Sequence, residues 1–153
     1  MVLVVLGPGE QETAVDDTAA RAWCEGIART CGVQHIQPNG RPYLDRYYAA
    51  GWHPAARRQG PAIFLHHFLA SDPSDAVHSH PWGWSASLIV VGGYREFRCR
   101  PGGGVVVRDF RPGDVNELGA DDQHRIDLLG PDCWTIFLAG DFRQPWRFLP
   151  LCE

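Results

Sequence analysis

Short apolar runs separated by turn residues make up most of the chain beyond residue 34. The runs are rich in aromatic and β-branched residues, and Gly, Pro, Asn and Asp separate them at short intervals. This pattern is typical of a β-sandwich or barrel. The expected strands cover residues 34–37, 42–49, 62–70, 76–80, 84–91, 94–100, 104–110, 115–118, 124–129, 133–140 and 146–150. Asn39-Gly40 and Gly92-Gly93 are each expected to form a tight hairpin turn. Because closure removes exposed strand edges, an antiparallel barrel is favoured over an open sheet.

One segment, residues 15–32, has helical periodicity instead. Ala19, Trp23, Ile27 and Ala28 recur at helical spacing, acidic residues precede them, and Gly32 follows. We therefore predict one amphipathic helix. The predicted organisation is an N-terminal strand and helix extension over residues 1–34 and an all-β barrel over residues 35–153.

Composition narrows the class of protein. A chain of 153 residues with 44% apolar residues and six tryptophans is expected to fold as one globular domain. The net charge is −4 and the arginines are scattered, so nucleic acid is not an expected partner. The sequence contains no lysine, which excludes a Schiff-base lysine. The apolar start is only six residues long, so neither a signal peptide nor a membrane span is expected. Five cysteines without C-x-x-C spacing predict reduced thiols in a cytoplasmic protein.

Three histidines carry the strongest chemical signal. His78 and His80 are two residues apart in an expected strand, so their side chains project to the same face. His124 opens a later expected strand, after the turn at Gly113-Asp114. Three imidazoles on facing strands would leave coordination positions of one metal ion free for water, dioxygen or substrate. The alternative is a metal-free barrel with buried aromatic residues around surface histidines.

These residues resemble the two motifs of the cupins. The pair His78 and His80 matches the first motif, Gly92 falls where its closing glycine belongs, and Gly113-Asp114 with His124 resembles the second motif. Ser85 stands where the family has a glutamate ligand. The resemblance implies a single-domain cupin, an antiparallel jelly-roll β-barrel, over about residues 35–149. The remaining three-histidine set is similar to that of thiol dioxygenases, which implies non-heme Fe(II) and dioxygen. An all-imidazole set also accepts Zn, Ni, Mn or Cu.

Further polar and aromatic residues are candidates for the site around this metal. Arg46 and Arg125 could bind a substrate carboxylate bidentately, as the resemblance to thiol dioxygenases implies, with surface salt bridges as the alternative. Glu96 could orient a ligand histidine or act as a base, with an exposed strand glutamate as the alternative. Tyr48 could supply a phenol. Expected pocket residues are Trp82, Trp84, Ser85, His66 and Tyr94.

The function expected from this combination is oxidation of a small molecule. We expect a mononuclear Fe(II) oxygenase that acts on an amino-acid-like or natural-product substrate with dioxygen, and a homodimer is a conceivable assembly. Two alternatives stay open at this point. One is a Zn or Ni cupin that acts as an isomerase, lyase or hydrolase. The other is a non-catalytic barrel that binds a small ligand.

Overall fold

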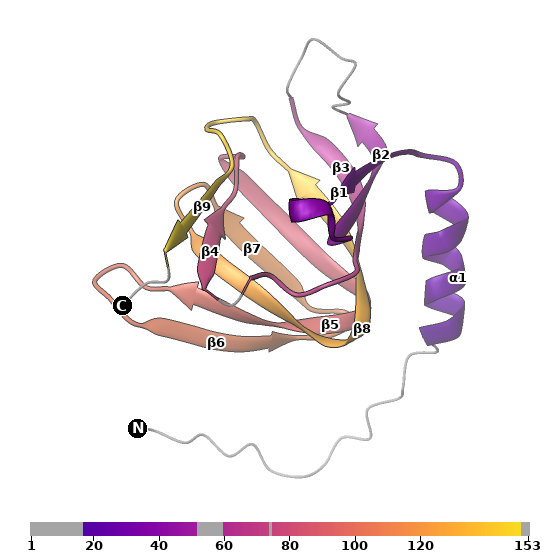
Figure 1. Ribbon diagram of the computed structural model, residues 1–153. Coiled ribbons are helices and arrows are strands. Elements are labelled where there is room, and N and C mark those ends of the chain that lie inside the picture. The colour runs from indigo at the N-terminus through magenta and orange to yellow at the C-terminus, as the bar shows by residue number, and fades with distance from the viewer. Residues whose placement is uncertain (1–16, 52–59, 74, 151–153) are drawn as a thin grey trace.

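The computed structural model describes residues 17–51, 60–73 and 75–150 of the chain. Over these residues an antiparallel sheet curls on itself, and the helix lies on its outer side (Figure 1). Side chains on the inner side of the sheet line a cavity, which is called the hollow below. The elements are α1 (Asp17–Ala28), β1 (Gly32–Ile36), the 3₁₀ turn Pro38–Gly40, β2 (Leu44–Gly51), β3 (Ala62–Phe68), β4 (Ala76–Ser79), β5 (Trp84–Cys99), β6 (Val105–Phe110), β7 (Val115–Gly119), β8 (Gln123–Ala139) and β9 (Arg147–Pro150).

Strands β5 and β8 organise the sheet. One path of paired strands runs β1-β2-β3-β8-β4-β9, and β5 pairs with β6, β7 and β8. Every pairing among these strands is antiparallel. The expected all-β architecture with one helix is therefore confirmed for the described residues. The hairpin expected at Asn39-Gly40 is also present, because β1 and β2 pair on either side of it.

The structure has no hairpin turn at Gly92-Gly93, so this second prediction is wrong. Both glycines lie inside the single strand β5, whose two halves pair with successive parts of β8. The register shifts on both sides of Gly92, so the pair forms an irregularity in a bent strand. Gly92 has φ +74°, and a Cβ there would lie 2.3 Å from the carbonyl oxygen of Asp132. Glycine is thus needed where the strand bends, rather than where the chain reverses.

Alternation along the strands separates an inner from an outer face. Phe64 and His66 on β3 point to the inner side, where Phe64 packs with Trp82 and Phe137. Leu65 lies between them and belongs to an outer cluster covered by α1, together with Cys24, Val91 and Trp134. The helix therefore packs on the side of the sheet opposite the hollow.

The predicted domain boundary at residue 34 falls within β1. The strand expected ahead of the helix lies outside the described residues.

A polar cluster fastens the helix to the sheet. Arg21 donates two hydrogen bonds to Asp132, at 2.6 and 2.8 Å, and His67 Nε2 lies 2.7 Å from the same carboxylate. His67 also stacks on Trp134, with ring centroids 3.9 Å apart. The hydrogen bonds from Arg21 lower the pKa of Asp132 to about 2, and His67 adds to this effect. Burial of the carboxylate opposes the shift, but its effect is smaller than that of Arg21. The helix is held by a charged contact as well as by apolar packing.

The cysteines differ from the sequence-based expectation. Cys24, Cys31 and Cys133 are free thiols, but Cys99 is disulfide-bonded. The expectation that all cysteines are reduced is therefore wrong for Cys99. In the described parts of the chain, no helix is both long and apolar enough to cross a membrane.

Candidate metal centre

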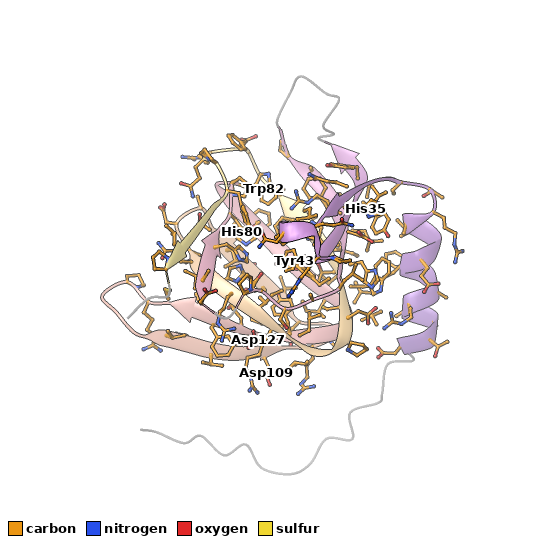
Figure 2. All side chains as sticks on the ribbon, in the orientation of Figure 1. His35, Tyr43, His80, Trp82, Asp109 and Asp127 are labelled. Carbon is orange, nitrogen blue, oxygen red and sulfur yellow. The ribbon has the colours of Figure 1, made fainter. Side chains whose placement is uncertain are left out.

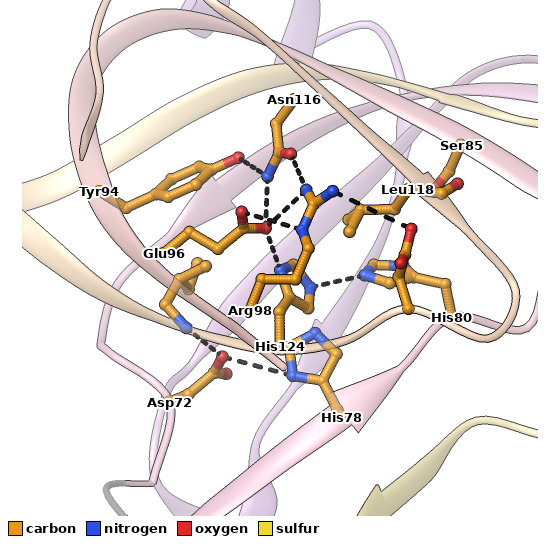
Figure 3. Close-up of polar contacts among 12 residues, drawn as sticks. Asp72, His78, His80, Ser85, Tyr94, Glu96, Arg98, Asn116, Leu118 and His124 are labelled. Carbon is orange, nitrogen blue, oxygen red and sulfur yellow. Dashed lines mark hydrogen bonds and ion pairs between the residues drawn. The ribbon is translucent and has the colours of Figure 1, made fainter. Parts of the chain in front are cut away.

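Three histidines from two paired strands meet in the hollow of the sheet. His78 lies on β4 directly opposite His124 on β8, and His80 follows the end of β4. The Nε2 atoms of His80 and His124 are 2.9 Å apart. One ring nitrogen of each histidine lies within 4.8 Å of the others, so the three are close enough to be ligands of one ion. Figure 3 shows the three rings facing one another.

His124 is held from behind by Glu96. Its Nδ1 lies 2.6 Å from Glu96 Oε1 (Figure 3). Asn116 and Arg98 also donate to the Glu96 carboxylate, at 2.9 and 3.1 Å. Burial raises the pKa of Glu96, but these hydrogen bonds outweigh it and lower the pKa to about 2. The carboxylate is therefore charged, so Nδ1 of His124 donates and its Nε2 lone pair faces the other histidines.

His78 has a carboxylate behind it as well. Its Nδ1 lies 3.3 Å from Oδ2 of the buried Asp72. The same carboxylate accepts hydrogen bonds from the Tyr43 hydroxyl and, at 2.7 Å, from the backbone N–H of Ile126. Burial raises the pKa of Asp72, but His78 and the two hydrogen-bond donors outweigh it. The pKa therefore lies below its usual value, and the group stays charged. Asp72 thus directs Nδ1 of His78 away from the hollow and turns its second nitrogen toward the centre (Figure 3).

The local electrostatics suit a metal ion. Burial lowers the pKa of His80 well below its usual value, and the neighbouring His124 and His78 lower it further. Burial also lowers the pKa of His124, although the hydrogen bond to Glu96 opposes this. Neutral imidazoles with lone pairs aimed at one point are the form that binds metal. The donor set therefore fits a divalent transition-metal ion.

The histidines line a cavity of about 300 Å³. Its other described lining residues are mainly apolar: Ile36, Leu44, Phe68, Pro81, Trp82, Leu118, Ile126, Phe137 and Trp146. The polar lining residues besides the three histidines are Gln34, Tyr43, Arg46, His66, Ser87 and Tyr94. The described lining contains no aspartate, glutamate or cysteine, so the cavity is apolar with a few polar groups, as small-molecule sites are.

Besides the three histidines, four of the residues singled out from the sequence line this cavity: Arg46, His66, Trp82 and Tyr94. Figure 2 shows Trp82 and His80 in the hollow, together with Tyr43. The Tyr94 hydroxyl accepts a hydrogen bond from Asn116 at 3.0 Å. His66 is 3% exposed and stacks on Phe137.

Besides Glu96, four other candidates do not line the described cavity. Arg125 pairs with Asp127 at 2.5 Å, and its guanidinium lies over the Phe97 ring. Tyr48 donates its hydroxyl to Gln34 at 2.9 Å.

The other two candidates outside this lining are residues 84 and 85. Trp84 is 45% exposed, because the regular strand resumes only after Pro81 and turns this ring outward. Ser85 is fully buried, with its hydroxyl 3.5 Å from the Leu118 carbonyl. Glu96, in contrast, is buried behind His124, so it contacts a candidate ligand without lining the cavity.

Sequence reasoning missed most of the groups behind the histidines. Asp72 lies in a loop that resembles a simple turn, and its carboxylate reaches Ile126 only through the fold. Arg98 on β5 and Asn116 on β7 share a 2.5 Å hydrogen bond, although Arg98 lies outside the part of β5 that pairs with β7. The only sequence signal for such groups is a polar residue at an inward-facing position of a strand. Asn116 is an example, because it is buried while its neighbours Val115 and Glu117 are exposed.

No protein-family model matches the sequence, and no curated protein matches it. Solved structures do match. The chain superposes on HppE with Fe(II) and the alternative substrate (S)-1-HPP at 9% identity and a TM-score of 0.58, with 74% of this chain and 57% of that chain covered. It superposes on the DMSP lyase DddQ from Ruegeria pomeroyi DSS-3 at 14% identity and a TM-score of 0.62, with 88% and 69% covered.

A third match concerns the fold itself. An uncharacterised conserved protein with a double-stranded β-helix domain from Klebsiella pneumoniae is 14% identical, with a TM-score of 0.51 and 76% and 92% of the two chains covered. The chain spans little more than half of the HppE chain, so the match there is to part of that protein. The curled antiparallel sheet agrees with these neighbours, so the chain has the fold that they share, a double-stranded β-helix. In this chain His78, His80 and His124 converge inside that fold.

Proposed function

We propose that this protein is a mononuclear metal-dependent enzyme that oxidises a small molecule with dioxygen, with Fe(II) as its metal. His78, His80 and His124 would hold the ion through their inward nitrogens. A bound Fe(II) with open positions would supply activation of dioxygen and a template for the substrate beside it. The donor set supports a divalent transition-metal ion. Support for iron in particular comes from the fold neighbour HppE, whose structure holds Fe(II).

One observation favours oxidation over acid–base chemistry. The described cavity lining has no carboxylate or thiol that could remove a proton from a substrate. Burial and the nearby Asp72 raise the pKa of Tyr43 well above its usual value, so this phenol stays protonated and acts as a hydrogen-bond donor. Burial lowers the pKa of His66 well below neutrality, which makes it a weak base. Because the described lining offers no suitable base, it is better matched to chemistry done by the metal.

The rest of the chain would prepare the site for this chemistry. Glu96 and Asp72 would keep His124 and His78 in the tautomer that presents a lone pair to the ion. Trp82 and Phe137 pack on the cavity wall and would exclude bulk water from the reacting groups.

A lyase with a Zn or Ni ion is the second candidate, and the likeness to DddQ favours it. In that reaction the metal would act as a Lewis acid. His78, His80 and His124 would hold that ion, as in the first proposal.

Anaerobic reconstitution with Fe(II) followed by oxygen-uptake assays tests the proposal. The substrate panel should contain small amino acids, thiols and aromatic carboxylates. We expect substrate-dependent oxygen consumption with Fe(II) and none with Zn. Turnover of a substrate with Zn or Ni, without oxygen consumption, would overturn the oxygenase proposal in favour of the lyase.

A further inference from the structure

His80 differs from the other two candidate ligands in what lies behind its ring. His124 Nδ1 lies 2.6 Å from Glu96, and His78 Nδ1 lies 3.3 Å from Asp72 (Figure 3). The Nδ1 atom of His80 is buried and has no hydrogen-bond partner in the described parts of the chain. No described carboxylate therefore fixes the tautomer or the rotation of the His80 ring, as one does for each of the others.

The strand ladder also ends before His80. Strand β4 ends at Ser79, which pairs with Gln123 on β8. Pro81 follows His80 and has no backbone N–H to donate. The His80 ring stacks on Phe137, with ring centroids 5.7 Å apart, and this limits the tilt of the ring. Stacking of the ring does not fix where the backbone of His80 lies, so this backbone needs a contact of its own.

Residues 141–144 provide that contact, because they run alongside residues 80–83. Three backbone hydrogen bonds join the two segments, at 2.7, 2.9 and 3.2 Å. Trp82 and Phe142 form an antiparallel bridge between them. This pairing brings Gln144 next to the chain that follows β4.

The side-chain amide of Gln144 links the two loops that lead to the ligands His80 and His124. Its Nε2 donates to the backbone carbonyl of His80 at 3.2 Å and to that of Ala120 at 2.6 Å. Ala120 lies between β7 and β8, shortly before His124. Because carbonyl oxygens only accept, the atom between them has to be the amide nitrogen, whose two N–H groups serve one carbonyl each. One side chain thus holds together the backbones on either side of the centre.

This link bears on a distance that a shared ion requires. The Nε2 atoms of His80 and His124 are 2.9 Å apart. Glu96 fixes the ring of His124, so the place of the His80 backbone decides whether its imidazole reaches the same ion. Gln144 does not line the described cavity, so its effect on the centre would pass through His80.

We propose that Gln144 is a positioning residue of the metal centre, which holds the backbone of His80 where its imidazole can share an ion with His124. The three ligands would then be held by two different means. A carboxylate lies behind the ring of His78 and of His124, and a side-chain amide holds the backbone of His80. This inference rests on the metal centre of the proposed function, but not on its oxygen chemistry.

The affinity of a Gln144→Met protein for Zn tests this inference. Met is similar in length to Gln, carries no charge and has no N–H to donate. Zn is the probe because it has no redox chemistry, and competition with a chelator measures its Kd. We expect Gln144→Met to raise the Kd about tenfold, as loss of a group that orients a ligand does. The matched control is Gln37→Met, at an exposed glutamine after β1, which should bind Zn as the wild type does.

Two backgrounds separate a role through His80 from a general loss of structure. In His80→Ala the ligand that Gln144 positions is absent, so adding Gln144→Met should leave the Kd for Zn unchanged. In Glu96→Gln the ligand His80 is intact, so adding Gln144→Met should again raise the Kd about tenfold. Thermal melts of the metal-free proteins check that each variant is folded. Gln144→Ala, which also lacks the donor, takes the place of Gln144→Met if that protein does not fold.

The outcomes distinguish this inference from the proposed function. Zn binding by the wild type without oxygen uptake by the Fe(II) form would overturn the oxygenase and leave the role of Gln144 standing. A wild-type protein that binds no Zn would overturn the metal centre and this inference together. An unchanged Kd in the folded Gln144 variant, or an equal rise of the Kd with and without His80, would overturn the role of Gln144 alone.

Discussion

The Glu96 carboxylate lies 2.6 Å from Nδ1 of His124, and both side chains are almost completely buried. Asn116 and Arg98 donate to the same carboxylate and keep it in place. A buried carboxylate that accepts from one nitrogen of an imidazole fixes the ring orientation and makes the other nitrogen a better ligand. Glu96 is thus a positioning residue for the proposed metal centre, even though it does not line the cavity.

Replacing Glu96 by Gln should therefore weaken metal binding. Gln keeps an acceptor but loses the negative charge, so we expect metal affinity to fall by about 10–100-fold. Competition with a fluorescent chelator measures this affinity. The control is Glu117→Gln on the exposed face of neighbouring β7, which should bind metal as the wild type does. Unchanged affinity in Glu96→Gln would show that this carboxylate does not tune His124.

The Asp72 carboxylate gives a second, independent prediction. Asp72→Asn places an amide group where Tyr43, Ile126 N–H and His78 require an acceptor. We expect a loss of about 1–3 kcal/mol in the free energy of unfolding, because a buried donor loses its partner. Metal affinity should also fall. Urea denaturation and chelator competition measure the two effects, with exposed Asp75→Asn in the same loop as the control. A stable Asp72→Asn protein with normal metal affinity would contradict this role.

Much of the fold could be predicted from the sequence, because alternation and turn residues act locally. The strands, the helix and the Asn39-Gly40 hairpin follow from such patterns. The bend at Gly92-Gly93 could not be distinguished from a hairpin, because both use glycine with positive φ. Whether the glycine pair makes a bend or a hairpin depends on β8, a strand more than 30 residues away that pairs with both halves of β5.

The site was less predictable than the fold. The three histidines stand out because their spacing and residue type are unusual for a surface strand. Their carboxylate partners are distant from them in the sequence. Glu96 is 28 positions before His124, and the carboxylate of Asp72 accepts from the N–H of Ile126, 54 positions later. Arg125 shows the reverse case, a residue close to a histidine in sequence but not at the cavity. It is adjacent to His124 in sequence, but alternation turns it to the other face, where it pairs with Asp127.

The contact between helix and sheet should depend on acid pH. Asp132 has a pKa of about 2 in the fold against an ordinary value of 3.8, so the charged form stabilises the folded state above pH 3.8 and this stabilisation is lost as the pH falls toward 2. We expect Asp132→Asn to cost about 1–2 kcal/mol at neutral pH. The difference from the wild type should shrink across that acid window. Urea denaturation at several pH values measures it, and a difference that does not change with pH would contradict this account.

Two glycine substitutions should have opposite effects on stability. Gly92→Ala forces a side chain into a positive φ and against the Asp132 carbonyl, so we expect a loss of several kcal/mol or no folded protein. Gly26→Ala in α1 meets no atom within 4 Å and should stabilise the protein by about 0.5–1 kcal/mol. Thermal melts compare the two, and a well-folded Gly92→Ala protein would contradict the bent-strand explanation.

The metal content of the reconstituted protein tests the central claim most directly. After anaerobic loading with Fe(II) and removal of excess metal, elemental analysis should find one iron per chain in the wild type. His124→Ala and His80→Ala should each lose most of it, and the exposed His35→Ala should keep it. A wild-type protein without bound iron, or a His124→Ala protein that retains one iron per chain, would contradict the three-histidine centre.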